Sequence, residues 1–364
     1  MYIQQLRLTH FRNFSSELIQ PSSSFNLLFG ANGAGKSSIL EALHLLGYGR
    51  SFRTSKPDSI IQFDHDMCTA FCKYVENTQE RAIGVSRSKK SGIEFNLNSL
   101  RTSRISDAAK VLPIQIFTPQ SSELITGPPM LRRRYIDWLL FHVEHSFYQS
   151  NKSFVGVLSQ RNALLKQCQA KSTQFFIDQD VWSPMLADHG VSIDRLREDY
   201  ISRLNLQLKA LYEEFRPDVE VELRYNRGWD SDLSLADALA HKLERDLTYG
   251  VTSVGPHKAD IRFLVNKKAA SEFLSRGQLR VFVSLLLVAE VRLLKELTGK
   301  KCIFLVDDIA AELDEGTREF FLDTIVSEGA QVFVTAIEKE QLPFANKYNN
   351  KKVFHVKHDH VIEE

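Results

Sequence analysis

Eight residues near the beginning of the chain carry the pattern of a phosphate-binding loop. They read Gly-Ala-Asn-Gly-Ala-Gly-Lys-Ser from Gly30 to Ser37, which matches G-x-x-x-x-G-K-[S/T]. Glycines allow backbone N–H groups to surround phosphate oxygens, the lysine brings positive charge to the β- and γ-phosphates, and the serine hydroxyl is a Mg²⁺ ligand. We therefore expect ATP with Mg²⁺ to bind at the following residues: Gly30, Asn32, Gly33, Gly35, Lys36, Ser37 and Ser38.

The residues on either side give this loop the setting that it needs. Residues 25–29 (FNLLF) predict a short apolar strand, and residues 38–46 (SILEALHLL) predict a helix that stops at Gly47. The N-terminal end of such a helix carries a partial positive charge that stabilises bound phosphate. The order of strand, loop and helix favours a nucleotide site over a glycine-rich turn without a ligand.

An acidic motif much later in the chain predicts the metal-binding half of the same site. Residues 302–306 (CIFLV) predict a buried parallel strand that ends in Asp307 and Asp308. An apolar strand followed by an acid is the Walker B pattern of P-loop ATPases. We expect Asp307 to hold Mg²⁺ together with Ser37. Lys36 and Asp308 are predicted to be catalytic, Lys36 by its charge and Asp308 by orienting the attacking water.

Residues 274–278 (LSRGQ) match the L-S-x-G-Q signature of ATP-binding-cassette (ABC) proteins. An ordinary helix start also fits S-x-G-Q, but the position between the P-loop and the Walker B strand favours the signature. Ser275, Gly277 and Gln278, at the start of a long apolar helix, would then form a second anion site. In ABC proteins the signature of one subunit closes on ATP held by another. Because this chain has one of each motif, we expect an ATP-dependent C₂ homodimer.

Two further positions are predicted from the ends of strands. Gln120 follows a strand predicted over residues 111–117 and is our candidate for the catalytic glutamine of the Q-loop, with Gln115 as the alternative. Thr335 ends a strand predicted over residues 329–335, where many ABC ATPases carry a switch histidine. We expect Thr335 to face the nucleotide.

The order of the motifs predicts an α/β fold, the head of an ABC-type P-loop ATPase with an inserted helical lobe. Lobe I, a mixed β-sheet with helices, would comprise residues 1–124 with the P-loop and residues 249–364 with the signature and Walker B. Residues 125–248 would form the mainly helical lobe II, with long amphipathic helices over residues 131–168 and 190–216. Residues 2–14 predict an edge strand followed by a turn.

Composition limits the classes of partner and location. The 364 residues carry a net charge of +1, so binding to a polyanion must rely on local basic patches. No run of 18 apolar residues predicts a membrane-spanning helix, and the first residues lack the features of a signal peptide. The four cysteines form no C-x-x-C pair and predict reduced thiols. We expect a cytoplasmic protein without a membrane partner.

Together these motifs resemble the RecF family of bacterial DNA-repair ATPases. The resemblance covers nearly the whole chain and is carried by the signature and by residues 8–14 (LTHFRNF), 29–42 (FGANGAGKSSILEA), 161–166 (RNALLK), 254–260 (VGPHKAD) and 307–314 (DDIAAELD). It implies a two-lobed head similar to that of SMC proteins, which binds duplex and gapped DNA when ATP dimerises it. It further implies that the protein helps RecO and RecR to load RecA at single-strand gaps, in support of replication restart and the SOS response, at the nucleoid.

The resemblance also implies roles for residues that no motif assigns. Arg12 and Asn13, at the turn after the first strand, are expected to reach the nucleotide.

Hydrolysis should be slow, because Asp308 is one methylene shorter than the glutamate that transporter ABC proteins commonly carry. The ATPase would then be weak, stimulated by DNA and used as a switch. The candidate DNA contacts are four basic stretches: 87–90, 101–104, 132–134 and 351–352.

Other interpretations share part of this pattern. A transporter ATPase would carry the switch histidine and a smaller insertion. An SMC-like structural protein needs continuous heptads, whereas Gly156, Pro184 and Gly190 predict breaks in the inserted helices. A metabolic kinase would need a complete site in one chain and would leave residues 274–278 unused. The alternative that stays open is an ABC-type ATPase with a protein partner and no direct role on DNA.

Overall fold

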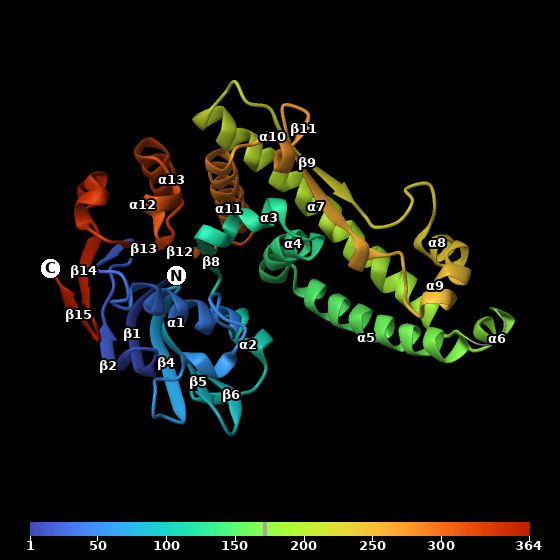
Figure 1. Cartoon of the computed structure of the whole chain (residues 1–364), viewed down its shortest axis with the longest axis horizontal. Coiled ribbons are helices and arrows are strands. Elements are labelled where there is room, and N and C mark those ends of the chain that lie inside the picture. Colours follow the sequence, from blue (N-terminus) through green and yellow to red (C-terminus); the bar gives the residue numbers. More distant parts are fainter. Residues whose placement is uncertain (170–172) are drawn as a thin grey trace. The chain divides into compact units, whose positions relative to one another are not determined.

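The computed structural model describes residues 1–169 and 173–364. The chain divides into two compact units (Figure 1), each with its own β-structure and helices. The first unit consists of residues 1–121 and 276–364, and the second of residues 122–275. The inserted unit therefore ends at Ser275, and the boundary predicted between residues 248 and 249 is wrong. Residues 260–265 belong to the insertion because they pair with its strand at 221–226.

A six-stranded sheet carries the P-loop in the first unit. Its strands, in spatial order, are β15 (His360–Glu363), β14 (Lys351–Lys357), β3 (Phe25–Phe29), β13 (Gln331–Ala336), β12 (Ile303–Val306) and β8 (Ile114–Phe117). All neighbours are parallel except β14 and β15. Every residue of β3, β12 and β13 is buried, which explains why their sequences are mainly apolar. The carboxyl ends of β3, β12 and β13 thus meet at one edge of the sheet.

A second, antiparallel sheet completes the first unit. Its strands, in spatial order, are β2 (Phe14–Ile19), β1 (Tyr2–Phe11), β4 (Met67–Glu76), β5 (Gln79–Ser88), β6 (Gly92–Leu97) and β7 (Leu100–Thr102). The first strand was predicted to lie at an edge, which is wrong, because β1 pairs with both β2 and β4. One hydrophobic cluster contains residues of α1 (Lys36–Tyr48) together with residues of both sheets, so α1 packs between them.

The predicted stop of α1 at Gly47 is also wrong by two residues. The helix continues through Gly47. An added Cβ there would lie 2.8 Å from Ile114 Cδ1, so a larger residue would require the Ile114 side chain to move. It ends instead at Gly49, which has a φ of 66° and donates its N–H to the Leu45 carbonyl at 2.8 Å. The remaining helices of the unit are α2 (Ile105–Ala109), α11 (Arg276–Thr298), α12 (Ile309–Glu312) and α13 (Glu315–Ser327).

The second unit is mainly helical, with one small antiparallel sheet. Its long helices are α4 (Pro129–Val143), α5 (His145–Cys168) and α7 (Trp182–Phe215). Its short helices are α3 (Glu123–Thr126), α6 (Thr173–Ile177), α8 (Leu235–His241), α9 (Leu243–Tyr249) and α10 (Ala270–Phe273). The sheet has the order β11 (Lys268–Ala269), β10 (Asp260–Val265) and β9 (Val221–Asn226).

The long helices differ from their predicted bounds. The segment predicted as one helix over 131–168 is two helices, separated at Glu144. The next helix, α7, begins at Trp182 rather than at residue 190, and the predicted breaks at Gly156, Pro184 and Gly190 all lie inside helices. At Gly190 a side chain would collide with Leu235, which explains a glycine there. In the described part of the chain, no helix has both the length and the apolarity needed to cross a membrane.

Candidate nucleotide-binding site

The P-loop joins β3 to α1 and has a backbone that only glycine adopts easily. Gly30, Gly33 and Gly35 have φ values of 148°, 80° and 114°. A Cβ at Gly30 would lie 2.3 Å from the Val356 carbonyl oxygen, and one at Gly35 would lie 2.6 Å from the Asn13 amide. The backbone conformation therefore favours glycine at all three positions, and the close approach of neighbouring chain segments also requires it at Gly30 and Gly35.

The Lys36 ammonium lies inside this loop. Its Nζ donates to the carbonyl oxygens of Gly30 at 2.6 Å and Ala31 at 2.9 Å. Burial lowers the pKa of Lys36, and the carboxylates of Asp308 and Asp307 oppose that shift. The loop thus holds a cation beside backbone N–H groups at the start of α1, which fits the phosphates of a nucleotide.

Asp307 links the ends of two strands to the P-loop helix. Its Oδ1 accepts hydrogen bonds from Ser37 Oγ at 2.9 Å and from Thr335 Oγ1 at 2.8 Å. These contacts form because β12 and β13 are parallel neighbours, with Val306 opposite Val334. A carboxylate beside a serine hydroxyl is an oxygen-ligand set that suits Mg²⁺. The pair predicted to hold the metal is therefore in contact.

Asp308 lines the site and has a constrained backbone conformation. Its φ of 51° is left-handed, and it forms the N-cap residue of α12. Its backbone N–H donates to Thr335 Oγ1 at 2.8 Å. Thr335, which is 1% exposed, therefore fixes the backbone at Asp308 and the carboxylate of Asp307 at once.

A cleft of about 590 Å³ gathers most of the predicted residues, and its volume suits a nucleoside triphosphate. The predicted residues that line it are Arg12, Asn13, Asn32, Gly33, Gly35, Lys36, Ser37, Ser38, Asp307, Asp308 and Thr335. Gly30 contributes through its carbonyl oxygen, which binds Lys36. Five predicted residues do not line it: Gly30, Gln120, Ser275, Gly277 and Gln278.

The structure separates the two candidates for the Q-loop glutamine. Gln115 is buried on β8, and its Nε2 donates to Glu290 Oε2 on α11 at 2.5 Å. That amide is committed to the core and is not available to a nucleotide. Gln120 is exposed in a 3₁₀ turn (Pro119–Ser122), next to Pro119, which lines the cleft. Gln120 therefore remains the candidate.

The signature residues lie at the N-terminal end of α11. Ser275, Gly277 and Gln278 are all exposed, and a Cβ at Gly277 would meet no atom of the described chain within 4 Å. This open helix start is accessible from outside the chain. It fits a site that is completed by a second molecule.

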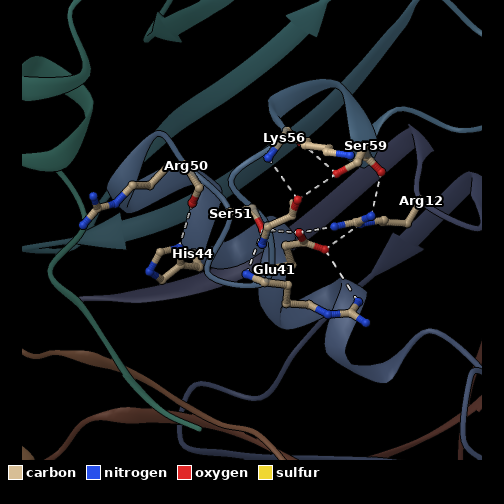
Figure 2. A network of polar contacts seen from close by, with 9 residues as sticks. Arg12, Glu41, His44, Arg50, Ser51, Lys56 and Ser59 are labelled. Carbon is tan, nitrogen blue, oxygen red and sulfur yellow. Dashed lines mark hydrogen bonds and ion pairs between the residues drawn. The ribbon is translucent and has the colours of Figure 1, made fainter. Parts of the chain in front are cut away.

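Arg12 lines the cleft, and its guanidinium forms hydrogen bonds to other residues of the protein (Figure 2). Its Nε and Nη2 donate to the two carboxylate oxygens of Glu41 at 2.8 and 2.6 Å, and its Nη1 donates to the Ser59 carbonyl at 2.6 Å. Glu41 is fully buried on α1, and Ser51 Oγ also donates to it. Arg12 therefore holds α1 and the 51–59 segment, and its expected contact with the nucleotide stays a prediction.

Asn13 has a similar supporting position. Its Nδ2 donates to the Ala34 carbonyl oxygen at 3.1 Å and also to the His358 carbonyl oxygen. The amide therefore fastens the P-loop to the turn that precedes β2 and to the β14–β15 turn. The Asn13 amide contacts a backbone carbonyl oxygen of the P-loop. Its expected contact with the nucleotide is supported only by its position in the cleft wall.

Arg53 is a cleft residue that the sequence motifs did not indicate. It lines the cleft, and its side chain is 45% exposed. Its Nη1 is 3.7 Å from Glu41 Oε2, so the guanidinium is only loosely paired. A signal was present in the sequence, because the stretch after α1 (residues 50–53, RSFR) places two arginines directly behind a P-loop helix. Its exposure and loose pairing leave the Arg53 guanidinium available to a phosphate.

Comparison with known proteins agrees with the fold and the site. The family model described as "RecF/RecN/SMC N terminal domain" matches residues 2–361. The DNA replication and repair protein RecF of Pseudoalteromonas atlantica is 44% identical over 365 residues, covering 100% of both chains. That of Shewanella denitrificans is 37% identical over 361 residues, covering 99% of each chain.

Solved structures of two proteins resemble this chain in fold. The recombination mediator protein RecF with ATP, from the RecFOR pathway, has a TM-score of 0.87 at 26% identity and covers 100% of this chain and 97% of that chain. An Smc head bound to the C-terminal winged-helix domain of ScpA has a TM-score of 0.60 at 16% identity, with 100% and 98% covered, which shows a shared fold.

The fold and the cleft define an ABC-type ATPase head, as predicted from the order of the motifs. Two RecF proteins resemble this chain over its full length, which narrows the class from ABC-type ATPase heads to one family. The chain belongs to the RecF family.

Proposed function

We propose that this protein is an ATP-dependent DNA-binding protein of recombinational repair. ATP drives it into a homodimer that binds duplex and gapped DNA, and slow hydrolysis resets it. In cooperation with RecO and RecR it helps to load RecA at single-strand gaps, supporting replication restart and the SOS response in the cytoplasm at the nucleoid. The observation that carries this proposal is the cleft in which Ser37, Asp307 and Thr335 meet beside Lys36.

The nucleotide part of the proposal follows from that cleft. Lys36 and the P-loop N–H groups would hold the phosphates, and Ser37 with Asp307 would hold Mg²⁺. The ion neutralises phosphate charge when bound. Asp308, held by its N–H on Thr335, would orient water in the cleft. Its short side chain supports slow turnover.

The dimer is supported by the position of the signature. Its residues are exposed and do not line the cleft among the described residues. A second copy would bring its signature to the cleft of the first, and C₂ symmetry would form two such sites. ATP would then add to the interface, so the dimer should depend on nucleotide concentration.

The DNA part rests on the family and on exposed cations. The related proteins from Pseudoalteromonas and Shewanella are named for DNA replication and repair. Within the basic stretches, Arg132 is committed to Asp260 at 2.6 Å, Arg87 to Asp58 at 2.9 Å, and Lys352 to Glu363 at 2.9 Å. These ion pairs make the stretches 132–134 and 351–352 weaker candidates than predicted.

Within the predicted basic stretches of the first unit, three exposed cations form no ion pair with other described residues: Lys90, Arg101 and Arg104. Arg101 lines a shallow groove on the outer face of the antiparallel sheet, together with Phe71. Phosphate contacts of this kind need only accessible positive charge and no base readout. We propose these three residues as backbone contacts.

Fluorescence anisotropy tests the proposal. Binding of a labelled duplex and of the same duplex with a gap is measured with ATP and with ADP, at one fixed salt concentration. We expect tight binding with ATP, weak binding with ADP, and a preference for the gap. The Lys36→Met variant serves as the control that should bind only weakly in both states. No binding in either state would support an ABC-type ATPase whose partner is a protein. Equal binding with ATP and ADP would contradict the control of DNA binding by ATP.

A further inference from the structure

Two stretches of the chain that the nucleotide cleft does not use meet in the second unit. They are residues 161–162, on α5, and residues 252–258, which follow α9. Arg161 is 1% exposed and donates from Nη1 to Asp246 Oδ2 at 2.9 Å and to Thr252 Oγ1 at 2.7 Å. The two stretches are therefore parts of one buried polar network.

This network fixes the loop that follows α9. Asn162 Oδ1 accepts from the Thr252 N–H at 2.8 Å and from the Thr252 hydroxyl at 2.7 Å. The other oxygen of Asp246, Oδ1, accepts from the Ser253 N–H at 3.0 Å. Gly250 ends α9 with a φ of 66°. The buried Arg161 and Asp246, with the partly buried Asn162, thus hold a surface loop in one conformation, which is how a binding site is preorganised.

The loop and α9 enclose a cavity of about 350 Å³. Its lining residues are Arg245, Tyr249, Val251, Ser253 and Lys258. The volume lies at the lower end of the range for ligand pockets and suits one nucleotide unit. All five residues belong to the second unit, so the cavity is a feature of that unit alone.

The chemistry of the lining selects an anion that carries a flat apolar group. Arg245 and Lys258 are exposed and form no ion pair in the described part of the chain. The nearby acid Asp246 is neutralised by Arg161, so it does not compete for these cations. Tyr249 is 68% exposed, which is unusual for a ring of this size, and Ser253 Oγ has no hydrogen-bond partner among the described residues.

We propose that this cavity binds one unpaired nucleotide of a DNA single strand, with its phosphate on Arg245 and Lys258 and its base on Tyr249. Cations beside an exposed aromatic ring are the usual combination for single-stranded nucleic acid, because every base has a face that stacks. In a duplex the base faces are covered by their neighbours, so the ring has no role there. This inference rests on the proposed function and adds a contact for the unpaired strand of a gap.

The test compares two DNA probes with the full chain and a non-hydrolysable ATP analogue. One probe is a blunt labelled duplex, and the other is the same duplex with a ten-thymidine 3′ overhang. We expect Tyr249→Ala to weaken overhang binding about fivefold or more and to leave blunt binding unchanged. Tyr249→Phe keeps the ring and should retain wild-type affinity for both probes.

The cations are tested by the salt dependence of overhang binding. The Arg245→Gln/Lys258→Gln variant should lower the slope of log K against log salt by about 0.7 for each charge removed. Arg195→Gln, an exposed cation of α7 outside the cavity, is the matched control and should not change the slope. All replaced side chains are exposed, so the fold should be retained, and thermal unfolding checks this directly.

The outcomes separate this inference from the proposed function. If the unchanged protein binds neither probe with the ATP analogue, the proposed function fails and the inference fails with it. If the unchanged protein binds both probes but the Tyr249 and cation variants bind the overhang equally well, the inference alone is overturned. An equal loss on the blunt and overhang probes would also overturn it, because the cavity would then contact duplex.

Discussion

Ser37 and Asp307 are 270 positions apart in the sequence, and their side chains are joined by a hydrogen bond of 2.9 Å. The contact exists because β3, which leads into the P-loop, is separated from β12 only by β13. Thr335 at the end of β13 donates to the same carboxylate oxygen. Three strand ends thus build one site, although a complete helical unit is inserted between its two halves in the sequence.

Thr335→Val should disturb this site without changing its shape. The replacement is nearly isosteric but removes the hydroxyl that donates to Asp307 and accepts from the Asp308 N–H. Leaving that buried N–H without a partner costs about 1–3 kcal/mol. We expect lower stability in urea unfolding and slower ATP turnover. Thr335→Ser keeps the hydroxyl and should behave as the wild type, and a valine variant with normal turnover would remove Thr335 from the site.

Asp308→Asn should separate ATP binding from hydrolysis. Asparagine tolerates the left-handed φ of 51° at this position, so the backbone should not change. The amide has no negative charge with which to orient and activate water. We expect ATP-driven dimerisation, followed by sedimentation, to persist while phosphate release falls to background. Unchanged phosphate release would show that another group has this role.

Arg12 and Arg53 should respond differently to the same replacement. Arg12→Gln breaks the bidentate pair with the buried Glu41. Breaking a fully buried pair costs about 3–5 kcal/mol, and because Arg12 is 21% exposed we expect about 2–3 kcal/mol in urea unfolding. Arg53→Gln removes an exposed, loosely paired cation, so stability should change by less than about 0.5 kcal/mol. ATP affinity, measured by calorimetry, should fall mainly in the Arg53 variant.

That pair of variants also tests an assignment made from the structure. If Arg12→Gln were as stable as the wild type and lost ATP affinity, Arg12 would be a nucleotide contact as the family resemblance implied. If Arg53→Gln bound ATP normally, its place in the cleft wall would have no energetic consequence. Glu41→Gln provides a third check, because it weakens the pair with Arg12 without changing either arginine.

Stability should fall in mild acid because of buried histidines. Burial lowers the pKa of His44 to about 4, against 6.5 in an unfolded chain, so the folded state keeps the ring neutral while the unfolded state binds a proton. The contribution is therefore complete above pH 6.5 and is lost as the pH falls toward 4, by up to about 3 kcal/mol. Urea unfolding at pH 7, 6 and 5 measures the slope.

His44→Phe is the variant that assigns this slope. Phenylalanine keeps an aromatic ring against Tyr48, whose centroid is 4.2 Å from that of His44, but it does not titrate. It loses the hydrogen bond to the Arg50 carbonyl oxygen, so its stability at pH 7 should be lower. The slope between pH 6.5 and 4 should become flatter. It should not vanish, because burial also lowers the pKa of His257 to about 4.

Local motifs in the sequence were sufficient for the ABC-type fold and the family. Lys36, Ser37, Asp307 and Thr335 could be placed because each sits at the end of an apolar strand or in a loop of fixed pattern. In a parallel sheet such ends meet at one edge, so the site follows from the strands. The Walker B aspartate and the P-loop serine are in contact for this reason.

The parts that could not be predicted depend on long-range partners. The end of the insertion was placed too early, because only the pairing of β10 with β9 assigns residues 260–265 to the second unit. Arg12 holds α1 through its hydrogen bonds to Glu41. In the sequence Glu41 looks like an ordinary polar residue of an amphipathic helix, so this contact could not be predicted. Gln115 is excluded as the Q-loop glutamine only because its amide donates to Glu290, a contact that the sequence does not show. Periodicity and motifs carry none of this information.

The central claim is that ATP and DNA stabilise each other's binding, and the most direct test measures ATP affinity with and without DNA. The Asp308→Asn variant is suitable because it should bind ATP without consuming it. Coupling of two ligands is reciprocal, so DNA must tighten ATP by the same factor by which ATP tightens DNA. We predict that saturating gapped duplex increases ATP affinity about tenfold or more, in the range of typical coupling. An ATP affinity that DNA leaves unchanged would contradict the account.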